Sequence, residues 1–233
     1  MQFIEKNSFN VRSAIYRLKK DGAGLEFILF PMIHVGSKEF YNEVSDRLSE
    51  CDLILAEGVD SKKAHLLTRS YRIVKKIKRM DLVTQQEGMK VAGFRDKVMN
   101  ADMEGRAFEA QWSSLPFALK AQIFFFMPVY IIYLFLFGTR ETIAENIAVE
   151  DLPSSTEVLL QDDDFDKLDA LLIDERDRRL IRNIASLHEA SGQDKKVVGI
   201  VFGAMHMRNV TRFLLHKLKY RIAEAEWVTV FDL

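Results

Sequence analysis

The sequence predicts an α/β protein in which two similar halves contribute to one mixed central sheet flanked by helices. Two stretches carry this prediction: residues 25–37 read LEFILFPMIHVGS, and residues 197–209 read VVGIVFGAMHMRN. Each is an apolar run typical of a buried strand, followed by a break and then a histidine. At one fixed offset His34 overlies His206. A strand–turn–histidine–helix–strand unit is therefore expected twice, bringing two imidazoles to the carboxyl ends of strands.

The remaining elements follow from apolar spacing and capping signals. We expect a hairpin from the runs 13–19 and 25–30 around the turn Asp21-Gly22-Ala23-Gly24, a helix over 37–50 capped by Ser37, a buried strand at 52–56, a third strand at 97–100, a long helix capped by Asp162-Asp163-Asp164, a helix at 210–218 and a closing strand at 226–231. In the overlay of the two units, residues 52–57 fall on residues 224–229. The whole chain is expected to form one domain, with half one at about 1–110, a helical insertion at about 113–160 and half two at about 161–233.

Composition limits the class of protein. The 233 residues are 48% hydrophobic, which is enough to bury a full core. A net charge of −1 gives no overall field that would favour nucleic acid. The single cysteine, Cys51, excludes an internal disulfide framework and fits a reducing compartment. The N-terminal residues 1–13 are polar and contain no apolar signal core, so the expected location is the cytoplasm.

Two segments of the middle region suggest partners. Residues 62–79, from Lys62 to Arg79, carry eight Lys or Arg side chains and no acid. Such a run is either a solvated helix face or a surface for anionic lipid. Residues 123–137, from Ile123 to Phe137, form the most apolar segment (IFFFMPVYIIYLFLF).

The apolar segment is shorter than the roughly 20 residues that a membrane span requires, and Pro128 would kink it. A single crossing would also place His34 and His206 on opposite sides of the bilayer. We therefore expect a buried or interfacial helix, serving as a lid, as a homodimer contact or as a hairpin that dips into lipid. Peripheral membrane contact through both middle segments is the second choice.

Four side chains at expected strand ends are candidates for chemistry. His34 and His206 follow strands, Glu57 ends the strand 52–56, and Asp102 comes just after the third strand. Ligands and catalytic groups usually sit at such strand ends in open α/β sheets. Two imidazoles and a carboxylate can hold a divalent metal that activates water for hydrolysis. Without metal, one histidine can act as the general base with Glu57 orienting it. These residue spacings favour neither mechanism.

Arg176 lies on the apolar stripe of the long predicted helix, with Leu180, Ile184 and Leu187. A core-facing arginine needs a counter-charge or a bound anion, because an unpaired buried charge is very costly. We expect it either to reach the site, where it would orient Glu57 or hold a substrate anion, or to extend from the helix edge and pair with Asp169.

The quoted motifs resemble one family. Residues 33–60 (IHVGSKEFYNEVSDRLSECDLILAEGVD) resemble the opening motif of the TraB/PrgY/GumN/Tiki family, whose usual form is a strand, a G-x-x-H turn, a helix and a strand ending in Glu. Residues 174–210 are similar to the later motifs, a helix with Glu-Arg and a second G-x-x-H, intact here as Gly203 to His206. In the first motif Pro31 stands where the family commonly has Gly. The resemblance covers both ends of the chain, about half of it.

The resemblance implies a fold of two repeated halves, related to the erythromycin-esterase and ChaN-like proteins. For the Tiki branch it implies a divalent-metal-dependent peptidase, with the metal on His34, Glu57 and His206. Other branches are linked to peptide-pheromone shutdown, haem or iron binding, and metal-free ester hydrolysis. We therefore expect a hydrolase of peptides or amides that uses Mn, Co or Zn, with Asp102 as ligand or base and Arg176 as anion holder. The alternatives are a metal-free esterase-like hydrolase and a non-catalytic protein that sequesters a peptide or haem-like ligand against residues 123–137.

Overall fold

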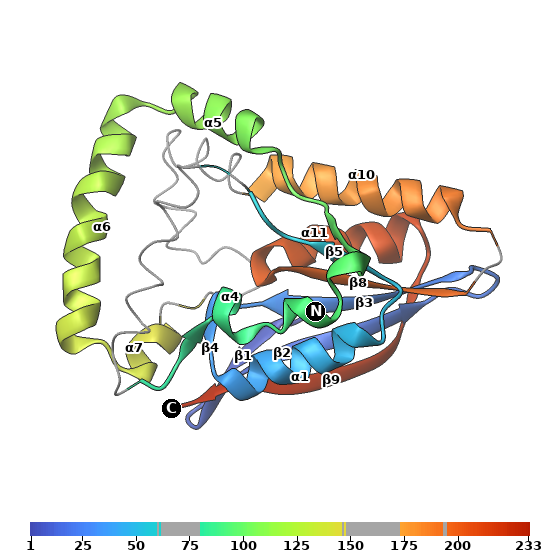
Figure 1. Cartoon of the computed structure of the whole chain (residues 1–233), viewed down its shortest axis with the longest axis horizontal. Coiled ribbons are helices and arrows are strands. Elements are labelled where there is room, and N and C mark those ends of the chain that lie inside the picture. The colour runs from blue at the N-terminus through green and yellow to red at the C-terminus, as the bar shows by residue number, and fades with distance from the viewer. Residues whose placement is uncertain (60, 62–79, 146, 148–172, 193–194) are drawn as a thin grey trace.

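The computed structural model describes residues 1–59, 61, 80–145, 147, 173–192 and 195–233, and these form a mixed α/β fold (Figure 1). In the described chain, seven strands form one sheet, and two short strands form a second, small sheet. The strands are β1 (Ile4–Lys6), β2 (Asn10–Lys19), β3 (Leu25–Met32), β5 (Leu53–Ala56), β7 (Val98–Asn100), β8 (Lys196–Gly203) and β9 (Arg221–Asp232), with β4 (Val35–Gly36) and β6 (Val83–Thr84) in the small sheet. The mixed central sheet predicted from the sequence is thus present.

The centre of the large sheet is parallel. β8 lies between β3 and β5, β7 follows on the far side of β5, and all these pairs run in the same direction. The other edge is antiparallel: β2 pairs with β3 through the predicted hairpin, and β9 pairs with β2 along nearly its whole length. The closing strand is therefore longer than predicted. In the sequence comparison of the two halves, β9 corresponded to β5. In the sheet, β9 pairs with β2 at the antiparallel end, whereas β5 belongs to the parallel part.

Helices cover both faces of the sheet. They are α1 (Lys38–Ser49), α4 (Gln85–Gly88), α5 (Gly105–Ser114), α6 (Phe117–Phe137), α7 (Arg140–Glu145), α10 (Glu175–Ala190) and α11 (Met207–Arg212), which continues into a π-helical turn at Phe213–Lys217, with 3₁₀ turns at Val91–Gly93, Arg95–Lys97 and Ala204–His206. Ser37 caps α1 as predicted, its side chain accepting a hydrogen bond from the amide of Phe40 at 3.1 Å. The predicted helix at 210–218 is divided between α11 and the π-helical turn.

The period of the strands sorts the core into two layers, because successive side chains of a strand point to opposite faces. Ile28 and Phe30 of β3 belong to the cluster that contains the buried face of α1. Phe27 and Leu29 belong to the cluster with α10 and α11. Figure 1 shows α1 on one side of the sheet and α10 and α11 on the other. This three-layer arrangement fixes the carboxyl ends of the parallel strands relative to α10.

Helix α6 differs from the prediction. It begins at Phe117, continues through Pro128, and stands at the left edge of Figure 1, away from the sheet. Of the two alternatives expected for this segment, the buried helix is wrong, since Phe125, for example, is 69% exposed while α1, α10 and α11 fill both faces of the sheet. The interfacial helix stays a prediction. Among the helices of the described residues, α6 has the length and the apolar composition that crossing a membrane requires.

Two predicted features lie outside the described residues. These are the basic segment 62–79 and the start of the long helix at 162–172, including Asp169. The described part of the predicted long helix is α10, which begins at Glu175.

Candidate functional site

The carboxyl edge of the parallel sheet gathers three of the predicted side chains. Glu57 directly follows β5, Asp102 follows β7 by two residues, and His206 follows β8 by three. Because β8, β5 and β7 are parallel neighbours, these positions meet at one edge. His206 Nε2 lies 3.9 Å from Glu57 Oε1. The strand order therefore brings together Glu57 and His206, which are 149 residues apart in the sequence.

Arg176, in the first turn of α10, enters this edge and joins the two acids. Its Nε donates to Asp102 Oδ1 at 2.8 Å and its Nη2 to Asp102 Oδ2 at 2.7 Å, a fork that matches the carboxylate. Nη2 also donates to Glu57 Oε1. The side chain of Arg176 is only 12% exposed, so the counter-charge predicted for a core-facing arginine comes from Glu57 and Asp102. Burial opposes the charge, but these partners raise the pKa of Arg176 above its ordinary value.

Asp102 is fully engaged by its neighbours. Besides the two bonds from Arg176, Oδ2 accepts the amide of Gly58 at 2.9 Å and Oδ1 accepts the amide of Met103 at 2.7 Å. A carboxylate offers about four lone-pair sites, and four donors occupy them here. The side chain is also 0% exposed. Asp102 thus positions Arg176 and the strand ends, and this geometry favours neither of its predicted roles, metal ligand or base.

Glu57 lies between Arg176 and His206. Its Oε2 accepts the amide of Gly203 at 2.6 Å, which connects the end of β5 to the end of β8. Burial alone would raise the pKa of Glu57. The positive charges of Arg176, and of His206 and His34 when they are protonated, hold that pKa below its ordinary value. Glu57 is therefore a carboxylate in the site at neutral pH.

His206 is held by an acid that the sequence analysis missed. Its Nδ1 lies 2.7 Å from Asp177 Oδ1, and both side chains are almost completely buried. A carboxylate only accepts hydrogen bonds, so Nδ1 carries the proton and Nε2 is left to face Glu57. Asp177 Oδ2 accepts a second bond from Asn209 Nδ2 at 2.5 Å. A sequence signal existed: Asp177 falls in one i, i+3, i+7 stripe with the buried Leu180 and Ile184.

His34 is placed differently from His206. It is exposed, and it precedes β4, which pairs with β6 in the small sheet. Its backbone carbonyl accepts the amide of Gln85 at 2.9 Å. The charge of its ring reaches Glu57 and lowers the pKa of that acid, after larger contributions from Arg176 and His206. The structure thus brings His34 to the neighbourhood of the site on an exposed turn, whereas the ring of His206 is buried against Asp177.

The arrangement bears on whether His34, Glu57 and His206 could hold a divalent ion. In the described chain, no group of three or more His, Cys, Asp or Glu side chains is placed to hold a metal. An ion at Glu57 would also have to share Oε1 with the guanidinium of Arg176, while Oε2 is bound to the amide of Gly203. A fixed cation at that oxygen repels a second one. The side chains as they stand do not fit a resident ion, and the metal remains a prediction from the family resemblance.

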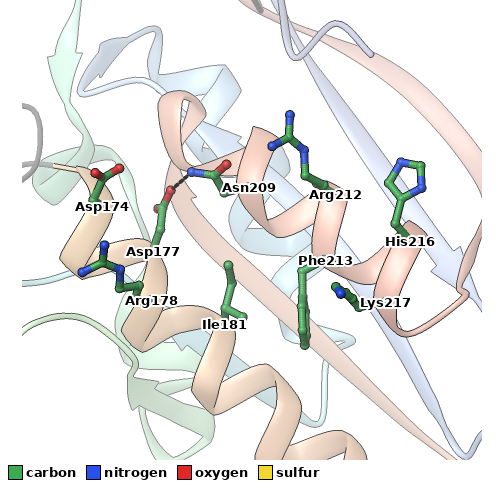
Figure 2. A pocket seen from close by; sticks show the side chains of 9 residues that line it. All are labelled: Asp174, Asp177, Arg178, Ile181, Asn209, Arg212, Phe213, His216 and Lys217. Carbon is green, nitrogen blue, oxygen red and sulfur yellow. Dashed lines mark hydrogen bonds between the residues drawn. The ribbon is translucent and has the colours of Figure 1, made fainter.

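A pocket of about 570 Å³ lies beside the buried pair of His206 and Asp177. It opens between α10 and α11, with Ile181 and Phe213 as apolar walls and Asp177 and Asn209 joined at one end (Figure 2). The remaining lining is charged or titratable: Asp174, Arg178, Arg212, His216 and Lys217. Asp177 is thus shared: one oxygen holds His206 and the other faces the pocket side, bonded to Asn209.

Comparisons with protein-family models, with curated proteins and with solved structures gave no match to this chain. The TraB/PrgY/GumN/Tiki resemblance therefore stays a prediction made from the motifs. Function is inferred from the site alone.

Proposed function

We propose that this protein is a hydrolase in which His206 is the general base at the carboxyl edge of the sheet. The observation that carries the proposal is the buried bond between His206 Nδ1 and Asp177 Oδ1 at 2.7 Å. It fixes the ring and its tautomer, so that Nε2 presents a lone pair toward the site. An acid bound to the far nitrogen of a histidine is the arrangement that orients catalytic imidazoles.

The proposed reaction is the hydrolysis of an ester or amide. Nε2 of His206 takes a proton from water as the water oxygen bonds to the carbonyl carbon. The bond to the leaving group then breaks, and that group takes the proton from the imidazolium. Two carboxylates stabilise the transient positive ring, Asp177 at Nδ1 and Glu57 at 3.9 Å from Nε2. Glu57 cannot donate the proton itself, because its lowered pKa keeps it ionised.

Arg176 and Asp102 support the two reacting groups in this scheme. Arg176 holds Glu57 by its Nη2 and Asp102 by a two-bond fork, so it fixes the carboxylate that faces His206. The role predicted for it, holding a substrate anion, would require part of this charge to face the substrate. The metal-dependent form of the hydrolase, with Mn, Co or Zn on His34, Glu57 and His206, remains an alternative form of the proposal.

The test uses the purified full-length chain with a reporter ester and a reporter anilide. After treatment with EDTA, we expect hydrolysis to persist, and His206→Ala to lower kcat/KM by about 10²–10⁴-fold. Asp177→Asn should lower kcat in the same direction, and His34→Ala should change kcat/KM by less than about tenfold. Each variant is checked for folding by circular dichroism.

Two results would redirect the proposal. If activity appears only with added Mn²⁺, Co²⁺ or Zn²⁺ and is lost equally in His34→Ala and His206→Ala, the metal-dependent form is correct. If His206→Ala hydrolyses both reporters at the wild-type rate, or the wild-type chain hydrolyses neither, His206 is not a catalytic base.

The pocket between α10 and α11 supports a second candidate, a binding protein. Its volume of about 570 Å³ is in the range of small-molecule sites, and three cationic lining residues against two acidic ones favour an acidic ligand: Arg178, Arg212 and Lys217 against Asp174 and Asp177. A haem-like ligand carries carboxylates and a large apolar ring, so haem is a suitable probe. Saturable haem binding that Arg212→Glu abolishes and His206→Ala leaves unchanged, with no hydrolysis by the wild-type chain, would establish this function instead.

A further inference from the structure

Helix α6 carries an exposed apolar surface that the proposed hydrolase does not use. Among the residues of this 21-residue helix whose side chains the structure describes, eleven large hydrophobic ones are more than a third exposed: Phe117, Phe124, Phe125, Phe126, Val129, Tyr130, Ile132, Tyr133, Phe135, Leu136 and Phe137. Monomeric soluble proteins rarely expose a contiguous apolar patch of this kind. An exposed apolar surface of this size indicates a contact with an apolar partner.

The exposed side chains surround most of the helix. Phe124, Phe125 and Phe126 are 45%, 69% and 62% exposed, and consecutive residues of a helix point about 100° apart. These three side chains alone thus cover more than half of the circumference. Leu119 and Leu134 mark the buried side, each 3% exposed. A second copy of the chain packing against α6 would cover one stripe, whereas lipid covers every exposed side.

The charge pattern of α6 also fits lipid. At about 1.5 Å per residue, its 21 residues extend about 31 Å, which is the length of apolar surface available to lie along a membrane. Residues 121–139 contain no Asp, Glu, Lys or Arg, and Lys120 and Arg140 stand at the two ends of this run. Charged side chains are costly inside hydrocarbon, so their absence from the run fits immersion.

The candidate site excludes a single crossing of the membrane. Glu57 and Asp102 precede α6, Arg176 and His206 follow it, and the four side chains lie within one cluster. The chain must therefore leave and re-enter the protein on the same side of the bilayer. Residues 140–174 contain no stretch longer than five residues without a charged side chain, so this sequence supplies no second span.

Both ends of α6 are attached to the protein body. At its start, Leu115 and Leu119 pack in one cluster with Met103, the residue after Asp102. At its end, Arg140 donates from Nε to the carbonyl of Met80 at 2.6 Å and from Nη1 to the carbonyl of Asp232 at 3.0 Å. α6 is thus anchored to the protein body at both of its ends.

We propose that α6 is immersed in the outer part of a lipid bilayer without crossing it, and holds the protein on the membrane surface. The occupant of the apolar surface is the acyl-chain region of lipid. The attachment of α6 next to Met103 then places the carboxyl edge of the sheet close to that surface, whether or not the edge is catalytic.

The first experiment is flotation of the full chain with preformed vesicles of neutral phosphatidylcholine. We expect the wild-type protein to float with the vesicles, and the variant with both Phe125→Glu and Ile132→Glu to lose at least about 90% of the floating fraction. The matched control is Ile222→Glu, an exposed apolar residue (42%) at the opposite end of β9 from Asp232. Circular dichroism shows that each variant is folded.

Three flotation results would overturn the proposal. They are a wild-type chain that does not float, a double variant that floats like the wild type, and a control variant that loses flotation equally. A non-floating wild type that is a dimer by light scattering, and becomes a monomer with Phe125→Glu and Ile132→Glu, would assign α6 to a homodimer instead.

The second experiment tests the orientation of α6. Ser114→Cys and Glu141→Cys, each with Cys51→Ala, place one thiol beside each end of the helix. Protein is added outside intact vesicles and treated with a membrane-impermeant maleimide. We expect both thiols to react before detergent is added. Protection of either thiol until detergent is added would mean that α6 crosses the bilayer, which the proposal excludes.

Discussion

The turns that carry His34 and His206 look equivalent in the sequence, yet they have different environments. His206 is buried, bonded to Asp177, and 3.9 Å from Glu57. His34 is exposed and leads into a two-stranded sheet with Val83 and Thr84. The difference comes from what lies over each strand end: α10 covers the end of β8 with Arg176 and Asp177, whereas the chain after β3 turns into β4. Similar motifs can thus place one imidazole in a buried network and the other on an exposed turn.

The largest expected effect tests the network on the His206 side. Asp102→Ala leaves Arg176 without its fork and the amides of Gly58 and Met103 without acceptors. Breaking a buried ion pair typically costs about 3–5 kcal/mol, so we expect a loss of that size in the free energy of unfolding. Urea denaturation measures it.

The control for Asp102 is Asp46→Ala. Asp46 pairs with Lys90 at 3.8 Å, but both side chains are more than half exposed, so its loss should cost less than about 1 kcal/mol. If Asp102→Ala were as mild as Asp46→Ala, the strand ends would not be held by a buried network.

The sequence predicted several strands, one helix start and the ion pairs of Arg176 well because these signals are local or periodic. Apolar runs gave β3, β5 and β8, and the serine cap gave the start of α1. The buried position of Arg176 required a counter-charge, and two acids of the predicted site, Glu57 and Asp102, supply it.

Other features depend on tertiary packing and were not predictable in the same way. Asp177 is adjacent to Arg176 in sequence, but its role depends on which face of α10 meets His206. The strand order that separates β9 from β5 depends on pairing between distant segments. The exposure of α6 could not be read from composition, because an apolar helix of this length is equally typical of a protein core and of lipid.

A smaller effect should appear in the pH dependence of stability. The pKa of Glu57 in the folded chain lies below its ordinary value of 4.5. A lowered pKa means that the ionised carboxylate stabilises the fold, and this contribution is complete above the ordinary pKa and is lost as pH falls through the folded-state pKa. Between pH 6 and pH 3, the wild-type protein should lose more stability than Glu57→Gln, as measured by urea midpoints. Parallel curves for the two proteins would show that Glu57 is not held ionised by Arg176 and His206.

The smallest expected effect concerns the His34 side. Ser37 caps α1 through a 3.1 Å bond from the amide of Phe40, so Ser37→Ala should lower the free energy of unfolding by about 1 kcal/mol. Thr84→Ala is the control: Thr84 occupies the N-cap of α4, pairs with Val35 in the small sheet, and makes no side-chain bond to the helix amides. Thr84→Ala should therefore lower the free energy of unfolding by less than half as much as Ser37→Ala does.

The cap also separates the two interpretations of the His34 turn. If the turn is mainly structural, Ser37→Ala reduces thermal stability and leaves kcat/KM on the reporter ester within about twofold of the wild type. If the turn instead holds His34 as a second catalytic group, loosening its cap displaces the ring, and kcat/KM should fall with the stability. Catalysis depends strongly on the position of such a group, so a fall of tenfold or more in a folded Ser37→Ala variant would make the two histidine turns functionally equivalent.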